Sequence, residues 1–247
     1  MIIFAHTNFG YTHIMTREDI KDYFNVAISV SMVIFAFDGE KIRILVQRRK
    51  EEPFTGAWQL PSRYVLPSES LELNAKILLE ETIPMTETID SYSEQLNAFG
   101  KVYRNPLGRV VNVGFYCIVK MTDEDRRLAE RKDMMWAAYT EIPDLAFDHN
   151  EIIDYAKQRL KRRFKRRPVG FSLLPKEFTL TQLQTLYEGA LNKKFDKRNF
   201  RKKVFNSALL IDLDKTIETS YGKVSKLYRF DEDKYEKMSL KGYDFLF

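Results

Sequence analysis

The chain has 247 residues, of which 44% are hydrophobic and 30% are charged. This balance is typical of a globular protein and excludes a wholly disordered or collagen-like chain. A membrane-spanning helix is not expected, because no run of about 18 apolar residues is present. The amino terminus has no basic-then-apolar signal layout, and the single cysteine, Cys117, is interpreted as a packed core thiol. These features predict a cytoplasmic protein without disulfides or a membrane partner.

Charge is distributed unevenly along the chain. Residues 1–149 carry 17 basic and 22 acidic side chains, whereas residues 150–247 carry 23 and 13. The two parts therefore have net charges of −5 and +10, which together give the formal net charge of +5. Such asymmetry indicates two modules, of which the basic one faces a polyanion. A solvated basic face is an alternative that composition alone leaves open.

The first module is predicted to consist of strands interleaved with a helix. An almost unbroken apolar run over 26–37 is typical of a strand covered on both faces, and the Asp38-Gly39 pair after it predicts a hairpin turn. Apolar residues at helical spacing predict a helix over 70–82. This order favours an α/β or α+β class with a mixed sheet. The strands expected in chain order lie at 26–37, 41–47, about 95–104, about 110–121 and about 134–139.

A helix that links the modules is expected to start near residue 148. Asp148 and Glu151 are spaced as the N-cap and N3 residues of a capping box, and the helix that they begin runs to about residue 165. His149 falls in the first turn of this helix and is interpreted as a structural residue. His6 and His13 have no partners at a metal-ligand spacing.

The second module has the outline of a winged helix-turn-helix. Thr179 and Gln182 predict a capping box for one helix, and Asp196 predicts the N-cap of a second, basic helix. Extended segments at 209–214 and 224–230 predict a β-hairpin, the wing. A helix, a short turn, a basic helix and a hairpin in this order form the arrangement of DNA-binding winged helices.

The basic helix carries the side chains that DNA recognition needs. Phe200 and Val204 form its apolar side, and the exposed face opposite them is shared by Lys197, Arg198, Arg201 and Lys202. Arginine can pair bidentately with guanine and asparagine with adenine, while lysine holds phosphates. The alternative is an amphipathic helix whose charged face is only solvated. The candidate DNA contacts are Lys197, Arg198, Asn199, Arg201, Lys202 and Lys203 on the helix, and Lys223 and Lys226 on the wing.

Residues 58–84 resemble the Nudix box and its approach, in which the box has the pattern Gly-x5-Glu-x7-Arg-Glu-apolar-x-Glu-Glu-x-Gly. In that family the helix presents glutamates that hold Mg²⁺ at a diphosphate, and hard oxygen ligands gathered on one helix face explain the spacing. If Arg63 takes the place of the first glycine, Glu69 and Glu81 fall on glutamate positions. The Arg-Glu pair of the box, however, becomes Ile77-Leu78.

The box is also broken in the neighbouring alignment. Sliding the frame by one residue recovers Glu80 and Glu81, but it places Ser68 at the first glutamate and Lys76-Ile77 at the Arg-Glu pair. In the first alignment Pro84 replaces the closing glycine. Neither alignment keeps a complete carboxylate cage, so no catalytic residue, metal ligand or cofactor is assigned. An ordinary polar helix face is the alternative explanation of the remaining glutamates.

Nearly the whole chain, from about residue 24 to residue 230, resembles the Nudix-related transcriptional regulators, the NrtR type and its sugar-responsive relatives. This family fuses a Nudix-like sensor to a winged helix. The matching segments include 49–54 with Gly56 and Trp58, 94–96 with Phe99-Gly100, 104–110, 146–149, 173–175, 178–180, 196–203 and 227–230. The resemblance implies a Nudix-like α/β/α sandwich with a mixed sheet, followed by a winged helix-turn-helix. The expected division is an extension at 1–23, a sensor domain at 24–149, a linker helix at 150–167 and a DNA-binding domain at 168–247.

The resemblance further implies a homodimer that binds double-stranded operator DNA and responds to a small metabolite. Effectors in the family include ADP-ribose-type nucleotides and pentoses, so a sugar or nucleotide effector is expected. Arg104 and Arg109 flank a Pro/Gly turn, from which both side chains could reach one ligand. Pairing with acidic residues of the first module is the alternative. The candidate ligand contacts are Arg49, Arg63, Glu69, Glu81, Arg104 and Arg109.

Two other functions are compatible with the same chain. An active Nudix pyrophosphohydrolase with an accessory winged helix would need the glutamate cage that the box lacks. A Nudix-like module that binds RNA or protein would not need an asparagine set among arginines on a capped helix. The broken box and the basic helix therefore favour a ligand-responsive DNA-binding regulator that does not hydrolyse its ligand.

Overall fold

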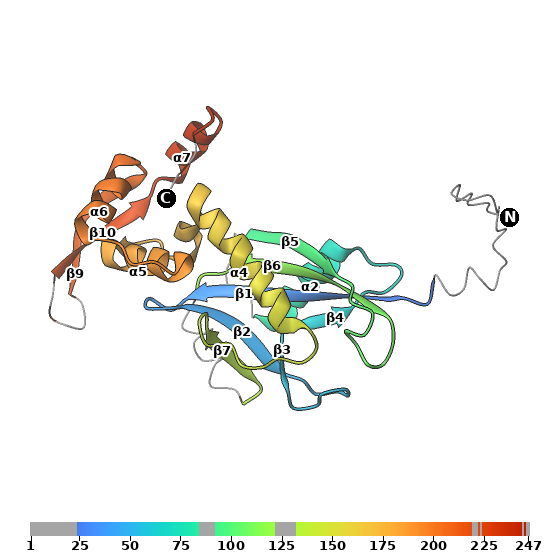
Figure 1. Cartoon of the computed structure of the whole chain (residues 1–247). Helices are drawn as coiled ribbons and strands as arrows, with labels where there is room; N and C mark the ends of the chain where they lie inside the picture. The colour runs from blue at the N-terminus through green and yellow to red at the C-terminus, as the bar shows by residue number, and fades with distance from the viewer. Residues whose placement is uncertain are drawn as a thin grey trace.

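The computed structural model describes residues 24–83, 92–121, 132–218, 222, 224–243 and 245. The expected amino-terminal extension with its two histidines, Pro84 and Lys223 lie outside these residues. Within the described ranges, no helix is long and apolar enough to cross a membrane. A first module built on a mixed sheet is followed by a smaller module of helices and a hairpin (Figure 1).

The mixed sheet organises the first module. Its strands follow the order β3 (Trp58–Gln59), β2 (Ile42–Arg48), β1 (Ala27–Phe37), β6 (Val110–Ile118) and β5 (Tyr92–Phe99), with β4 (Ser62–Tyr64) paired to β1 and β7 (Met134–Ala138) paired to β2. β1 is parallel to β6 and antiparallel to both β2 and β4. The sequence-based predictions of a mixed sheet and of a hairpin between β1 and β2 are confirmed.

The five predicted strands are present, although their ends differ from the prediction. β5 stops at Phe99 instead of continuing to residue 104, because residues 100–109 fold back as a loop. In this loop Arg104 N donates to Lys101 O at 3.2 Å, and Arg109 Nη1 donates to Gly100 O at 2.8 Å. The pattern does not predict β3 and β4, since strands of two and three residues are too short to show a period.

Helices cover both faces of the sheet, with α4 in front and α2 behind it in Figure 1. α2 (Leu71–Thr82), which is capped by Ser70, packs on the side of β1 that carries Ile34. α4 (His149–Arg166) packs on the side that carries Phe35. Because successive residues of a strand point to opposite faces, these are two distinct layers of core. The predicted α/β/α sandwich is confirmed.

The predicted capping box at the start of α4 is wrong. Asp148 is the N-cap residue, but its side chain makes no hydrogen bond to the helix backbone. Its two carboxylate oxygens instead accept hydrogen bonds from Arg104, and the carboxylate of Glu151 lies 2.5 Å from Lys101 Nζ. Both groups of these ion pairs carry a full charge, whereas a backbone amide donor is neutral, so the carboxylates pair with the cations instead of capping the helix.

The second module begins with two capped helices, as predicted. α5 (Leu180–Leu191) starts with the expected capping box, in which Thr179 Oγ1 accepts from Gln182 N at 3.2 Å and Gln182 Oε1 accepts from Thr179 N at 2.9 Å. α6 (Lys197–Asn206) follows a short turn, and the Asp196 carboxylate accepts from the backbone of its first turn. Helix–turn–helix geometry is therefore encoded by local capping signals.

A small sheet completes the winged helix. β8 (Phe178–Thr179), β10 (Val224–Phe230) and β9 (Leu210–Glu218) lie side by side in that order. The predicted hairpin is confirmed, and β9 extends beyond the expected residue 214. A further helix, α7 (Glu232–Ser239), follows the wing and is not predicted by the sequence analysis.

α4 also joins the two modules. Its buried residue Phe164 packs against Tyr187 of α5, with ring centroids 5.0 Å apart. The short 3-10 helix η1 (Val169–Leu173) then places Phe171 on Phe230 of β10, where the rings stack at 4.3 Å. One buried apolar cluster therefore extends from the sheet into the winged helix. A displacement of α4 would disturb the packing of both modules.

Gly170 lies at this junction and allows its packing to be tested. A methyl group added there would lie 2.8 Å from Tyr187 Cε2 and 2.9 Å from Phe164 Cε1. We expect Gly170→Ala to lower the free energy of unfolding by about 1–3 kcal/mol, the usual cost of overpacking. Urea unfolding followed by circular dichroism measures this change.

Gly189→Ala is the matched control for that substitution. Its added methyl group would touch only Ile42, at 3.9 Å, and alanine favours the helical backbone of α5. We therefore expect Gly189→Ala to be neutral or stabilising. Equal destabilisation by the two variants would contradict the idea of a crowded junction at Gly170.

Candidate functional site

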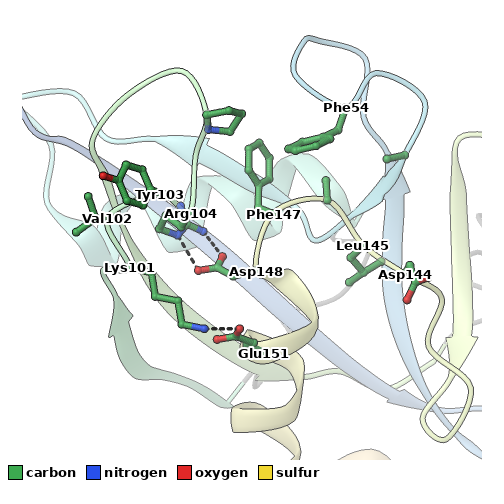
Figure 2. Close-up of a pocket in the computed structure, with 13 residues that line it drawn as sticks. Phe54, Lys101, Val102, Tyr103, Arg104, Asp144, Leu145, Phe147, Asp148 and Glu151 are labelled. Carbon is green, nitrogen blue, oxygen red and sulfur yellow. Dashed lines mark hydrogen bonds and ion pairs between the residues drawn. The ribbon is translucent and has the colours of Figure 1, made fainter.

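An open cavity of about 750 Å³ lies beside the amino-terminal end of α4. Three segments form its wall: the loop 100–109, the loop before β3 and the residues that lead into α4 (Figure 2). Its volume falls within the range of small-molecule sites, about 300–1,000 Å³. The cavity is therefore large enough to hold a small ligand.

A buried ion pair forms one side of the cavity. Arg104 Nε donates to Asp148 Oδ2 at 2.9 Å, and Arg104 Nη2 donates to Asp148 Oδ1 at 2.5 Å (Figure 2). Only 3% of the Arg104 side chain and 8% of the Asp148 side chain are exposed. A second pair, between Lys101 and Glu151, is more exposed. Both pairs join the loop 100–109 to the first turn of α4, and a bidentate pair fixes orientation as well as distance.

Two aromatic rings form the opposite side. Phe54 and Phe147 meet edge to face, with centroids 5.2 Å apart, and the guanidinium of Arg49 lies 4.9 Å from the Phe147 ring. Both phenylalanines have left-handed backbone conformations, with φ of 69° and 58°. Such conformations are unfavourable for bulky residues and persist only where the surroundings impose them. The cavity thus combines an apolar wall with hydrogen-bonding groups, and it can hold a ring that has both kinds of surface.

His149 anchors the start of α4 to the segment between β3 and β4. The imidazole is buried, and its Nδ1 accepts a hydrogen bond from Leu60 N at 3.1 Å. Burial, and secondarily the charge of Arg104, lowers the pKa of His149 to about 3. The side chain is therefore neutral at ordinary pH and acts as an acceptor within the fold, which agrees with its interpretation as a structural residue.

The side chain of Arg63 lies between those of Glu69 and Glu81, the two glutamates that fit the first alignment of the Nudix box. Its Nη2 lies 3.7 Å from Glu69 Oε2, and its Nη1 lies 3.9 Å from Glu81 Oε1. No group of three or more His, Cys, Asp and Glu side chains among the described residues is arranged to hold a metal ion. These residues do not fit a Mg²⁺ site, because a covalently attached cation already faces both carboxylates.

The other positions of the box serve structural purposes. Leu78, which stands in place of the Nudix glutamate, is buried in the core beneath α2. Thr82 donates to the carbonyl of Leu78 at 2.6 Å, and Glu80 lies 3.8 Å from Lys76 within the helix. α2 is thus a packed helix, and its acidic residues Glu80 and Glu81 face the basic side chains of Lys76 and Arg63.

The six residues predicted as ligand contacts fall in different places. Arg104 lines the cavity, whereas Arg49 and Glu81 line a second, more polar cavity of about 340 Å³ next to the end of α2. Glu69 and Arg63 belong to the ion group described above. Arg109 donates to the carbonyls of Gly100 and Lys101 and closes the base of the loop 100–109.

Several residues of the main cavity are not among the ligand contacts predicted from the sequence. Phe54, Phe147 and Asp148 lie there because of backbone conformations and a pairing that no local pattern reveals. The available signal was the resemblance of segments 49–54 and 146–149 to a family. That signal marks a region and does not indicate which side chain faces the cavity.

Six of the candidate DNA-contacting residues lie on the exposed surface of α6. Phe200 and Val204 are buried, whereas the predicted contacts at positions 197–199 and 201–203 are exposed. On the wing, Lys226 Nζ lies 2.8 Å from Asp212 Oδ2, and this bond raises the pKa of Lys226. A phosphate at that point would have to compete with Asp212, so α6 offers the more available cations.

Comparisons with known proteins point to one family. A winged-helix family described as "NrtR DNA-binding winged helix domain" matches residues 170–230. The chain is 30% identical over 232 residues to the "ADPR responsive transcriptional repressor NtrR" of Acinetobacter baylyi, a match that covers 92% of this chain and 87% of the relative. It is 28% identical over 162 residues to the "ADP-ribose pyrophosphatase" of Methanocaldococcus jannaschii, covering 63% and 91%. The crystal structure of Shewanella oneidensis NrtR complexed with a 27mer DNA matches with 29% identity and a TM-score of 0.70, covering 85% and 95%.

The neutral state of His149 predicts a pH dependence of stability. The pKa of His149 is about 3 in the folded chain, compared with the ordinary value of 6.5 that applies to the unfolded chain. Between about pH 3 and pH 6.5, therefore, only the unfolded chain binds a proton at this residue. The contribution of His149 is therefore complete above about pH 6.5 and is lost progressively as the pH falls toward 3. Melting temperatures measured from neutral to mildly acidic pH test this.

His149→Asn is the control for this titration. Its Oδ1 can still accept from Leu60 N, but asparagine does not ionise. The variant should lose less stability than the wild-type chain when the pH is lowered. Parallel pH profiles for the two proteins would show that another group governs the acid sensitivity.

Proposed function

This chain belongs to the family of NrtR-type, Nudix-related transcriptional regulators, and we propose that it is a ligand-responsive regulator whose winged helix binds operator DNA. The position of α4 carries the proposal. Its first turn forms part of the cavity wall, and its last turns pack into the core of the winged helix. A ligand in the cavity and a duplex on α6 therefore act on the same helix.

We propose that the cavity recognises a hydroxylated five-membered ring. Phe54 and Phe147 offer an apolar wall for the ring face, while Arg104 and Asp148 offer donor and acceptor atoms for its hydroxyls. Both cations of the cavity are already paired with carboxylates, so they supply little free charge for a diphosphate. The Acinetobacter relative is described as responsive to ADP-ribose, which contains such a ring, and a free pentose shares this chemistry.

The proposed response starts at the Arg104–Asp148 pair. A ligand hydroxyl that binds either side chain competes with the pair that joins the loop 100–109 to α4. Because this pair is buried, breaking it leaves a buried charge without its partner, which is unfavourable. The first turn of α4 is then expected to move to a position in which both charges are again compensated. The other end of the helix holds α5 through Phe164, and this contact can pass the change to the DNA-binding module.

We propose that α6 reads the operator and that two copies of the chain bind a two-fold symmetric site. Arg198, Asn199 and Arg201 lie near the helix start, where recognition helices contact bases. Lys202 and Lys203, with Lys226 on the wing, are assigned to phosphates. Lys223 is assigned to the same group from the sequence alone. The Shewanella relative is described in a complex with DNA, which supports this assignment.

We propose that the chain does not hydrolyse its ligand. Nudix hydrolysis depends on a cation held at the diphosphate, and the Arg63 guanidinium faces the carboxylates that would hold it. An arginine cannot coordinate or activate a water molecule as a metal ion does. The position of the catalytic glutamate is taken by the buried Leu78.

The hydrolysis assay is a direct comparison with the archaeal relative. Purified protein incubated with ADP-ribose and Mg²⁺ or Mn²⁺ is expected to release no AMP above a blank, because removal of such electrostatic stabilisation typically costs about 10²–10³-fold or more in rate. The pyrophosphatase of Methanocaldococcus jannaschii serves as the positive control. Metal-dependent AMP release by this chain would overturn the assignment.

The DNA-binding proposal is tested with a pair of asparagine substitutions on one helix. Asn199→Ala is expected to weaken binding to the DNA upstream of the gene by about 1–3 kcal/mol, because it removes a base contact, and to reduce the preference over scrambled DNA. Asn206→Ala, at the other end of α6, should leave both unchanged. Fluorescence anisotropy measures the affinities, and absence of any preference in the wild-type chain would refute the proposal.

The same assay identifies the effector. ADP-ribose without metal and a panel of free pentoses are added to the protein–DNA complex, and the active ligand should shift the affinity. Asp148→Asn weakens the pair as the ligand is proposed to do, so the DNA affinity of the variant without ligand should resemble that of the liganded wild-type chain and should shift less when the effector is added. An equal shift in the variant would place the effector outside the cavity.

A further inference from the structure

The carboxyl-terminal half of α4 carries a group of four exposed basic side chains. Lys161, Arg162, Lys165 and Arg166 are all exposed, and the last acidic residue of the helix is Asp154. Within the part of the chain that the structure describes, none of the four forms an ion pair with an acidic side chain. We call these four residues the basic stripe.

Helical spacing places the basic stripe on one side. Residues at i, i+1, i+4 and i+5 are neighbours on a helix surface, and the stripe lies opposite Leu160 and Phe164, which are fully buried. Two further arginines of the same segment, Arg159 and Arg163, do not belong to it. Their guanidinium groups bind the two carboxylate oxygens of Glu94 on β5, at 3.1 and 2.5 Å.

This contrast separates two kinds of basic residue on the same helix. The arginines that face the sheet have a carboxylate between them and hold α4 in place. The four residues that face solvent repel one another, since like charges four positions apart destabilise a helix. The negative end of the helix dipole favours cations in the last turn, which accounts for Lys165 and Arg166 but not for Lys161 and Arg162.

The location of the basic stripe indicates its partner. α4 continues through η1 into the winged helix, and its buried side packs on α5 (Figure 1). The stripe is therefore held rigidly beside the module that carries the proposed reading helix α6. A fixed row of uncompensated cations next to a DNA-binding module suits the phosphates of the same duplex.

We propose that the basic stripe binds the phosphate backbone of duplex DNA outside the segment that α6 reads. This inference rests on the proposed function, because it assumes that the winged helix binds DNA. The contact is independent of sequence, since lysine and arginine bind phosphates without reading bases. It would lengthen the bound segment of DNA and raise the salt dependence of binding, while the sequence preference would remain a property of α6.

The test uses a variant in which only the stripe is neutralised: Lys161→Gln, Arg162→Gln, Lys165→Gln and Arg166→Gln combined. Glutamine is a good helix former, so the fold should persist, which circular dichroism checks. A control variant removes four exposed cations of the first module, Lys50, Lys76, Lys120 and Lys132, by the same substitution. The control variant has the same net charge as the stripe variant. A difference between the two therefore reports a direct contact with DNA and not the general electrostatic attraction of a basic protein to DNA.

Binding is measured by fluorescence anisotropy over a series of salt concentrations, with random-sequence duplexes of about 40 and about 12 base pairs, the shorter being little more than one helical turn of about 10.5 base pairs. On the long duplex, the slope of log affinity against log salt should fall by about two to four for the stripe variant, because each phosphate contact contributes about 0.9. The control variant should keep the wild-type slope. On the short duplex, the wild-type chain and the stripe variant should behave alike.

Each other outcome has a clear meaning. Identical slopes for the stripe and control variants on the long duplex would overturn the inference while leaving the DNA-binding function intact. An equal loss on both duplexes would overturn the placement of the contact outside the read segment. The same measurement is made with a duplex RNA of equal length. A slope that falls for the stripe variant on RNA but not on DNA would show that the stripe binds RNA and not DNA. If the wild-type chain binds neither duplex, the proposed function and this inference both fail.

A substitution that conserves charge guards against indirect effects. Lys161→Arg combined with Lys165→Arg retains all four positive charges on the same face. This variant should keep the wild-type slope on the long duplex. A slope as low as that of the neutralised variant would indicate a change in the helix instead of a lost phosphate contact, and would count against the inference.

Discussion

Burial of one face of α4 is the constraint on which both modules depend. Ile152, Ala156, Leu160 and Phe164 are fully buried, and they complete the core of the sheet at one end of the helix and that of the winged helix at the other. Neither core is closed without this helix, so it is more than a spacer between two independent domains. Its two ends also carry different chemistry: ion pairs to the loop 100–109 at the start, and the exposed basic stripe toward the end.

Features encoded by neighbouring residues could be predicted from the sequence. The apolar run of β1, the capping box of Thr179 and Gln182, and the Asp196 cap all involve contacts over a few positions, and the structure contains each of them. The start of α4 differs, because its residues bond to a distant segment of the chain. Asp148 and Glu151 have the spacing of a capping box, but cations of the loop 100–109 take both carboxylates. A spacing rule cannot anticipate a competitor that lies 44 residues away in the chain.

The candidate site could not be predicted from the sequence, because it also depends on contacts between residues that lie far apart in the chain. The bond between Leu60 and His149 joins positions 89 residues apart, and the edge-to-face pair of Phe54 and Phe147 spans two loops. Such contacts are consequences of the packed fold and leave no period or local motif. The arrangement of basic residues on α6 was predictable, because a single helix determines which side chains share a face. Which of them touch bases depends on how the module approaches a duplex.

The guanidinium of Arg63 stands between Glu69 and Glu81, where a related hydrolase would bind a divalent ion. A counterion that belongs to the polypeptide cannot dissociate, and its occupancy does not follow the concentration of free magnesium. The electrostatics around the box are thus set at synthesis, and chelators or fluctuating metal supply leave them unchanged. A receptor built in this way reports the abundance of its ligand alone, whereas a metal-bridged receptor reports ligand and metal together.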